Sequence, residues 1–394
     1  MKLFLAKLHY EKNPNFFKRL LRGVLSLCAF PYGVVTSVRN FLYDKNIIKS
    51  YNAGVLTISV GNLTTGGVGK TPFTAELADM FIRQGKRVAI LSRGYGGRIP
   101  NKEVNVISDG EKIFYTAQEA GDEPFWLATN CKSVIVLTCS SRSKAAEKAV
   151  KDFNCDVLIA DDAFQHRKLA RNVNLLLVDQ ANRFGNERLL PAGPLREGFD
   201  GVKRATAIVV TNKTCNVENA LKYCDEVKER FNKPVFLCKM QPDISYNIKN
   251  NEILYKGASV LAFCAIGQPN EFFDFVKEKF YLTATMTFPD HHAYDLKDVA
   301  EKGLFFLSEN FNPKPPKHLT TFVDFVKEYI NFNSNRTSGA CGLPNLVPYM
   351  FYFWHKDVES DYLGMKSSHS ELEYAKQNCQ RFIYAVNQPC VRDR

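Results

Sequence analysis

The feature that most constrains this chain is a glycine-rich loop between an apolar run and a helical segment. Residues 61–71 read GNLTTGGVGKT and directly follow the apolar run 55–60. In such a loop, backbone N–H groups surround phosphate oxygens, the lysine reaches the outer phosphates, and the threonine hydroxyl holds Mg²⁺. The pattern therefore predicts an ATP-type nucleotide site made of Thr64, Thr65, Gly66, Gly67, Val68, Gly69, Lys70 and Thr71.

One position in this loop departs from the usual motif. Thr64 stands where the eight-residue pattern begins with glycine. A positive φ at a threonine would cost about 1 kcal/mol or more. We therefore expect either strain at Thr64 or a turn that differs from the usual one.

Short apolar segments alternate with amphipathic helical ones from residue 55 onward, which is typical of an α/β fold with a mostly parallel sheet. A helix is expected through the apolar face that begins at Thr74, with Gly85 ending it. We predict a P-loop-containing nucleotide triphosphate hydrolase-like parallel sheet with a second, smaller α/β domain. The predicted strands are 55–60, 88–91, 134–138, 157–160, 175–178, 207–211, 235–238 and 260–265.

The amino-terminal segment combines positive charge with an uncharged apolar run. Three basic residues between positions 18 and 22 precede residues 23–38, which carry no charge and contain Pro31. A helix of this run would cover about 24 Å, short of the roughly 30 Å hydrocarbon core of a bilayer. We expect it to lie in one leaflet; a buried core helix is the alternative. The formal charge of +11 also favours an anionic partner.

A second chemical signal follows the predicted strand 157–160. Asp161 and Asp162 stand at its carboxyl end, where a phosphate-loop sheet needs an acidic group to hold Mg²⁺. Adjacent carboxylates repel each other, so the pair implies a cation, with Arg167 as the nearest alternative to a metal. We assign Thr71, Asp161 and Asp162 to Mg²⁺.

Two further clusters favour phosphoryl transfer to an alcohol over simple hydrolysis. They are GDEP at 121–124 and FPDHHAY at 288–294. A carboxylate backed by an imidazole can orient an alcohol and accept its proton, and Asp122 with His291 would suit that role. On chemistry alone, an ordinary turn with Asp122 as a helix N-cap is the stronger interpretation of GDEP. The second cluster could instead be a metal pair.

These clusters resemble, in order and wording, those of the tetraacyldisaccharide 4'-kinase (lipid A 4'-kinase) family. The resemblance spans most of residues 16–321. It implies a kinase that uses ATP and Mg²⁺ to phosphorylate the 4'-hydroxyl of an acylated glucosamine disaccharide 1-phosphate, in lipid A biosynthesis. The motifs are SVGNLTTGGVGKTP (59–72), SRGYGG (92–97), GDEP (121–124), DDAFQHR (161–167), LPAGPLRE (190–197) and FPDHH (288–292).

The resemblance also implies roles for single residues. It gives Lys70 to ATP and makes Asp122 and His291 the leading catalytic pair, although the motif alone does not separate His291 from His292. Arg196 would steady phosphate charge. Substrate contacts are expected from Arg93 and Tyr95, whose alternative is a structural turn, and from Glu197.

The resemblance completes the expected organisation. Residues 1–45 form a membrane-associating helical segment, 46–170 the ATP-binding kinase domain, 171–330 a smaller α/β domain that completes the cleft, and 331–394 an extension without an assigned role. We expect a monomer at the cytoplasmic face of the bacterial inner membrane. Nucleic acid is not an expected partner, because the basic residues form no stripe interleaved with aromatic ones.

The alternative from another functional class is a membrane-surface ATPase that acts as a switch or positioning protein. Its loop carries a signature lysine at the position of Thr65. A lysine that contacts phosphate is not replaced by threonine without loss of its charge. This position and the acceptor clusters argue against the switch.

Overall fold

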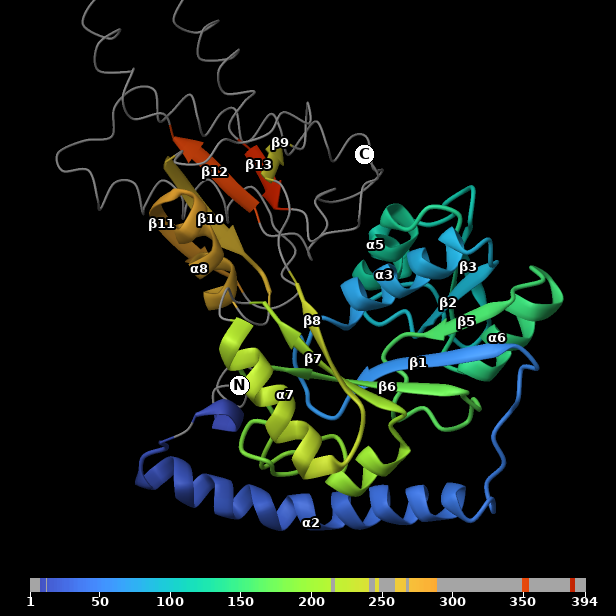
Figure 1. Ribbon diagram of the computed structural model, residues 1–394, viewed down its shortest axis with the longest axis horizontal. Helices are drawn as coiled ribbons and strands as arrows, with labels where there is room; N and C mark the ends of the chain where they lie inside the picture. The colour runs from blue at the N-terminus through green and yellow to red at the C-terminus, as the bar shows by residue number, and fades with distance from the viewer. Residues whose placement is uncertain are drawn as a thin grey trace, which may run out of the picture. The chain divides into compact units, whose positions relative to one another are not determined.

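The computed structural model describes residues 8–11, 13–213, 217–240, 245–247, 259–266, 269–288, 349–353 and 383–386. The chain divides into two compact units (Figure 1). Unit 1 comprises residues 1–241 with 390–394, and unit 2 comprises residues 242–389.

Unit 1 is built on an eight-stranded sheet with the order β3-β4-β2-β5-β1-β6-β7-β8. All neighbouring strands are parallel except β3, which pairs antiparallel with β4. The carboxyl ends of β1, β5 and β6 therefore meet at one edge, beside the phosphate loop. The strands are β1 (Leu56–Asn62), β2 (Val88–Ser92), β3 (Asn105–Asp109), β4 (Ile135–Thr138), β5 (Val157–Ala160), β6 (Val173–Asp179), β7 (Ala207–Asn212) and β8 (Val235–Lys239).

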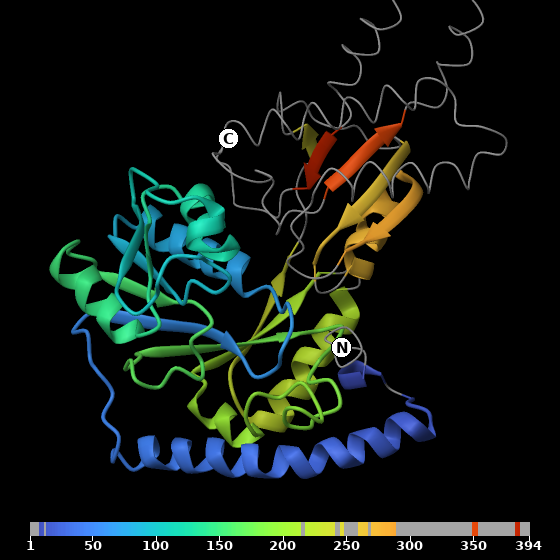
Figure 2. The same ribbon diagram turned by 180° about the vertical axis from the view of Figure 1, so that it is seen from behind.

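Helices lie on both faces of this sheet (Figure 2). One buried cluster packs α6 against β2, β4 and β5, and another packs α7 against β6 and β7. Because both faces are covered, β2, β4 and β5 are buried along their whole length. The helices after β1 are α3 (Lys70–Arg83), α4 (Ala117–Ala120), α5 (Asp122–Asn130), α6 (Arg142–Lys151), the 3₁₀ helix η1 (Phe199–Arg204) and α7 (Val217–Phe231).

The amino-terminal helix α2 (Phe16–Asp44) is longer than the run 23–38 from which it was expected. At 29 residues it extends about 43 Å. It continues through Pro31, whose missing N–H removes one intrahelical bond to the exposed turn at Leu27. Among the described residues, α2 is the one helix long and apolar enough to cross a membrane by length and composition.

Unit 2 contains a five-stranded sheet with the order β11-β10-β12-β13-β9. One side of β10 packs against α8 through Phe272, Phe273 and Val276. This confirms a second, smaller α/β part. Its elements are β9 (Ser245–Asn247), β10 (Ser259–Cys264), α8 (Pro269–Lys279), β11 (Tyr281–Thr287), β12 (Tyr349–Phe353) and β13 (Ile383–Val386).

The division between the units differs from the boundary expected at residue 170. Strands β6, β7 and β8 continue the sheet of β1 without interruption, so unit 1 extends to Gln241. The segment 171–241 therefore belongs to the unit that contains the glycine-rich loop, because its strands pair with that unit's sheet.

Candidate active site

The phosphate loop joins β1 to α3, as the sequence predicts. Positive φ angles occur at Gly66 (121°) and Gly69 (80°). Thr64 instead forms an isolated antiparallel bridge with Leu195 and is buried. The loop thus avoids the strain expected at Thr64, because its left-handed residues are glycines.

Side chains hold the loop carbonyls from outside. The Tyr10 hydroxyl donates to the Thr65 carbonyl, Lys213 Nζ donates to the Gly67 carbonyl (2.7 Å), and Thr211 Oγ1 donates to the Val68 carbonyl (2.9 Å). In a planar trans peptide the N–H points opposite to the carbonyl. Holding these carbonyls outward therefore turns N–H groups such as that of Gly69 toward the interior of the loop, where anionic oxygens bind.

Two cations converge on Asp162 beside this loop. Arg196 Nη1 lies 2.9 Å from both carboxylate oxygens, and Lys70 Nζ lies 3.5 Å from Oδ1. Burial alone would raise the pKa of Asp162, but the charges of Lys70 and Arg196 lower it to about 2. Lys70 also donates to Asn62 Oδ1 at 3.2 Å. The lysine is thus held at the mouth of the loop.

Asp161 has a different environment from its neighbour. Its side chain is 1% exposed, and Thr74 Oγ1 donates to Oδ1 at 3.1 Å. Burial, followed by the charges of Glu123 and Asp162, raises the pKa of Asp161 to about 7. A buried carboxylate with so little compensation fits a site for a divalent cation. The described residues contain no cluster of three or more His, Cys, Asp or Glu side chains.

Arg167 was the alternative to a metal beside the aspartates, and the structure places its side chain elsewhere. Its guanidinium lies 2.7 Å from Asp44 Oδ1 and donates to the Asn40 carbonyl at 2.8 Å. The residue follows the turn after Asp162, so its side chain points to α2 rather than back to the strand end.

Glu197 does not lie where a substrate ligand would. Its carboxylate is fully buried and accepts two 2.8 Å hydrogen bonds from Arg204 Nη2. Gln165 Nε2 (3.0 Å) and Asn40 Nδ2 (2.7 Å) donate to its two oxygens. The substrate contact expected for Glu197 is therefore contradicted by its burial, and its geometry suits the support of Arg196.

Asp122 begins α5 rather than capping it. Gly121 is the N-cap residue and has φ 92°. A Cβ built on Gly121 would lie 2.5 Å from the Tyr95 carbonyl oxygen, so the turn with Arg93 and Tyr95 packs directly against the start of α5. This turn and Asp122 are thereby brought together, and the Tyr95 side chain is 69% exposed. His291 and His292 lie outside the described residues.

Two residues that the sequence analysis left unassigned support the site. Gln165 Nε2 donates to the Asn62 carbonyl (2.9 Å) as well as to Glu197. Arg142 is 3% exposed and donates through Nη2 to the Asp161 carbonyl at 3.3 Å. Gln165 lies within a recognised motif, but nothing local in the sequence marks Arg142, because the strand end that it contacts belongs to a different part of the chain.

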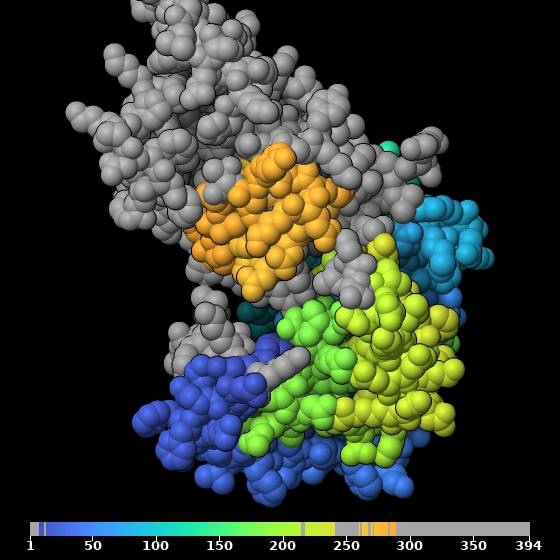
Figure 3. Space-filling model, turned by 60° about the vertical axis from the view of Figure 1, so that its left-hand side comes forward, coloured from blue at the N-terminus to red at the C-terminus, as the bar shows by residue number. Residues whose placement is uncertain are grey.

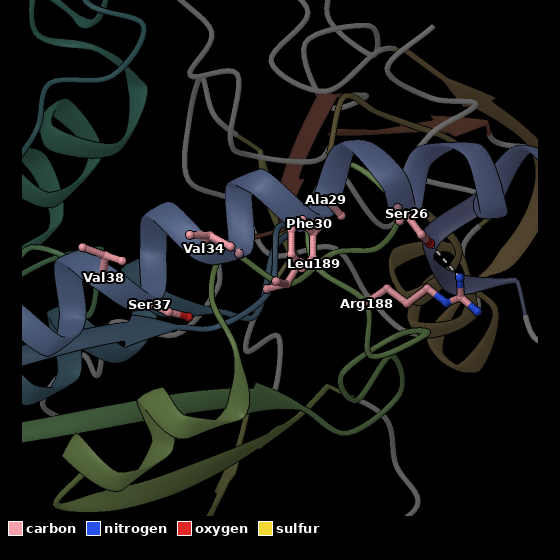
Figure 4. Close-up of a pocket in the computed structure, with 10 residues that line it drawn as sticks. Ser26, Ala29, Phe30, Val34, Ser37, Val38, Arg188 and Leu189 are labelled. Carbon is pink, nitrogen blue, oxygen red and sulfur yellow. Dashed lines mark hydrogen bonds between the residues drawn. The ribbon is translucent and has the colours of Figure 1, made fainter.

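An apolar groove runs along α2, opposite the loop that carries Arg188 and Leu189 (Figure 4). Its volume is about 630 Å³, and Phe30, Val34 and Val38 line one side. Gly33 allows α2 to lie close to Leu189, since a Cβ at Gly33 would lie 2.8 Å from Leu189 Cδ1.

Comparison with known proteins places this site in a family. The sequence profile of the family described as tetraacyldisaccharide-1-P 4'-kinase matches residues 21–338. A tetraacyldisaccharide 4'-kinase from Desulfotalea psychrophila is 37% identical over 274 residues, which cover 68% of this chain and 78% of that protein. One from Desulfatibacillum aliphaticivorans is 37% identical over 301 residues, covering 73% and 80%.

A solved structure agrees with these relatives. The crystal structure of LpxK from Aquifex aeolicus, described as an "apo" form in complex with ATP, is 32% identical. It matches with a TM-score of 0.57 and covers 75% of this chain and 86% of that one. Sequence profile, relatives and fold agree, and the chain belongs to the tetraacyldisaccharide-1-P 4'-kinase family.

Proposed function

We propose that this protein transfers the γ-phosphate of ATP to the 4'-hydroxyl of a tetraacyldisaccharide 1-phosphate, the lipid A precursor, forming the 4'-phosphorylated product. The observation that carries the proposal is the convergence of Lys70 and Arg196 on Asp162 beside the phosphate loop. Phosphoryl transfer depends mainly on positioning and on stabilisation of charge, and this arrangement offers both.

The nucleotide site follows from the loop. The phosphates bind in the loop of residues 64–71, where N–H groups such as that of Gly69 face the interior, and the first turn of α3 adds the positive end of its dipole. Thr71, Asp161 and Asp162 hold Mg²⁺. When bound, Mg²⁺ neutralises charge on the β- and γ-phosphate oxygens.

The transfer step uses groups from both sides of the loop. Arg196 pairs with Asp162 and provides a planar guanidinium for the charge of the transferred phosphoryl group. Asp122 orients the 4'-hydroxyl and accepts its proton, and His291, which lies outside the described residues, stays its predicted partner. Arg93 and Tyr95, whose turn packs against the start of α5, contact the sugar or its 1-phosphate.

The lipid enters from the side that faces the membrane, and this side is defined by α2. Its outer face exposes a line of large apolar side chains at helical spacing. This face lies in the cytoplasmic leaflet, and the apolar groove beside Leu189 suits one acyl chain. The exposed side chains on this face are Phe16, Leu20, Val24, Leu27, Val34, Val38 and Phe41.

Transfer of label tests the proposal. The purified protein is incubated in mixed micelles with γ-labelled ATP, Mg²⁺ and tetraacyldisaccharide 1-phosphate, and with the same lipid already phosphorylated at the 4' position as a matched acceptor control. We expect label in the first lipid and none in the second. ATP hydrolysis that is stimulated by membranes, with neither lipid labelled, would favour the switch ATPase instead.

A further inference from the structure

The inner face of α2 contacts the functional residues themselves. The Tyr32 hydroxyl donates to the Arg196 carbonyl at 2.6 Å, and Asn40 Nδ2 donates to Glu197 Oε2 at 2.7 Å. Eight residues separate Tyr32 from Asn40, close to two helical turns, so both point to the same side of α2. In Figure 3 the amino-terminal segment, in blue, lies against the green segment that follows β6.

These contacts continue to the phosphate loop. Glu197 accepts from Gln165, which donates to the Asn62 carbonyl, and the Asn62 side chain accepts from Lys70. A second route runs from Arg196 through Asp162 to Lys70. The helix is therefore joined by hydrogen bonds to the two cations that the proposed reaction uses.

The helix is also fastened along its length. Arg188 Nη1 donates to Ser26 Oγ at 2.8 Å, and Arg167 pairs with Asp44 at 2.7 Å. The fastened stretch from Ser26 to Asp44 extends about 27 Å. A helix that served only as an anchor would need an apolar outer face but none of these inward polar contacts.

We propose that α2 is part of the catalytic framework, and that Tyr32 and Asn40 are positioning residues that hold Arg196 for phosphoryl transfer. This inference rests on the proposed function. Tyr32 fixes the backbone of Arg196 from one side, while the Leu63 carbonyl accepts from the Arg196 N–H at 2.7 Å on the other. Asn40 fixes the next residue by completing the hydrogen bonds of the buried Glu197 carboxylate.

The position of the Arg196 guanidinium depends on how firmly its backbone is held. Its guanidinium reaches Asp162 only while its backbone stays in place, and a small displacement of a group that acts in the transition state costs a large factor in rate. Arg204 holds the Glu197 carboxylate from within the same segment, and Asn40 adds the bond that joins this carboxylate to α2. The contacts from α2 therefore help to hold Arg196 in place.

The test uses two tyrosines on the same helix. Tyr32→Phe removes the hydroxyl that donates to Arg196, whereas Tyr43→Phe removes a hydroxyl from a ring that stacks on the Arg167 guanidinium at 5.1 Å. Transfer of γ-phosphate to tetraacyldisaccharide 1-phosphate is measured in mixed micelles at saturating lipid. Loss of one neutral hydrogen bond predicts that kcat falls about 2- to 10-fold for Tyr32→Phe, with the lipid KM unchanged and Tyr43→Phe like the parent.

Two further variants separate positioning from stability and anchoring. Asn40→Ala removes a donor to a charged acceptor, so its kcat is expected to fall about 10- to 100-fold. In an Arg196→Lys background, Tyr32→Phe should cost little more, because residues that act through one another are not additive. Thermal unfolding and binding to anionic vesicles identify any variant that is merely unfolded or detached.

The outcomes are distinct. An unchanged kcat in Tyr32→Phe and Asn40→Ala, a rise confined to the lipid KM, or full additivity with Arg196→Lys would overturn the positioning role. If the parent labels no lipid, the proposed function itself fails. A fully active parent with an unaffected Tyr32→Phe variant removes only the present inference.

Discussion

Replacing Asp161 by asparagine should stabilise the protein without metal while weakening its response to Mg²⁺. Asp161 is buried at the end of β5 with Thr74 as its hydrogen-bond donor. Burial and the neighbouring carboxylates raise its pKa from 3.8 to about 7. Asparagine keeps the shape and can accept the Thr74 bond, but it has no charge to bury.

The magnitude and the sign follow from this pKa. Each pKa unit is worth about 1.4 kcal/mol, so the rise corresponds to about 4 kcal/mol when the group is fully ionised. Between pH 3.8 and about 7 the folded state binds more protons than the unfolded state, so the free energy of unfolding falls as the pH rises. Asp162, with its pKa lowered to about 2, is ionised in both the folded and the unfolded state above pH 5, so it does not make the free energy of unfolding depend on pH there.

Thermal unfolding of parent and Asp161→Asn between pH 5 and 8 measures the effect. His166, whose pKa burial and Arg142 lower to about 4, titrates in both proteins, so the difference between them isolates Asp161. Without Mg²⁺ at pH 7.5 the variant should unfold roughly 5–10 °C higher, for a gain of about 2–4 kcal/mol. Adding Mg²⁺ and ATP should stabilise the parent more than the variant. Equal stabilities across the pH range would refute the reasoning.

Three other substitutions probe separate parts of the site. Lys70→Ala removes the cation at the mouth of the phosphate loop, so affinity for ATP, measured by calorimetry, should fall at least 10-fold while the melting temperature changes little. Gly121→Ala places a Cβ 2.5 Å from the Tyr95 carbonyl oxygen at a positive φ, so stability and transfer should both fall, whereas Gly23→Ala, with open space around it, should change neither. Glu197→Ala removes the buried carboxylate that pairs with the partly buried Arg204, and urea unfolding should show a loss of about 3–5 kcal/mol.

The fold was predictable where buried strands appear in the sequence as short runs of apolar residues. All eight predicted strands are present, and the clearest of them, β2, β4 and β5, are short apolar runs because they are buried along their whole length. The strand β3 was missed, since it is an edge strand whose sequence NVISD contains only two apolar residues. The strands β9, β11, β12 and β13 of unit 2 were missed as well. The unit boundary was placed too early because no local feature shows that β6 pairs with β1.

The site was predictable where single motifs carry the chemistry. The phosphate loop and the two aspartates lie where their motifs place them. The surroundings of Glu197 were not predictable, because Asn40 lies 157 positions away and no pattern joins them. Arg167 was an alternative to a metal because it is close to Asp162 in sequence, but that closeness does not fix the direction of its side chain, which turns to Asp44.

The central claim is that one site binds ATP and delivers its γ-phosphate to a lipid alcohol, with Asp122 acting on the acceptor side only. The most direct test compares the parent with Asp122→Ala, measuring ATP affinity and transfer of label to tetraacyldisaccharide 1-phosphate in the same micelles. The account predicts unchanged ATP affinity and transfer reduced by about 10²-fold or more. Full transfer activity in Asp122→Ala, or loss of ATP binding together with transfer, would contradict it.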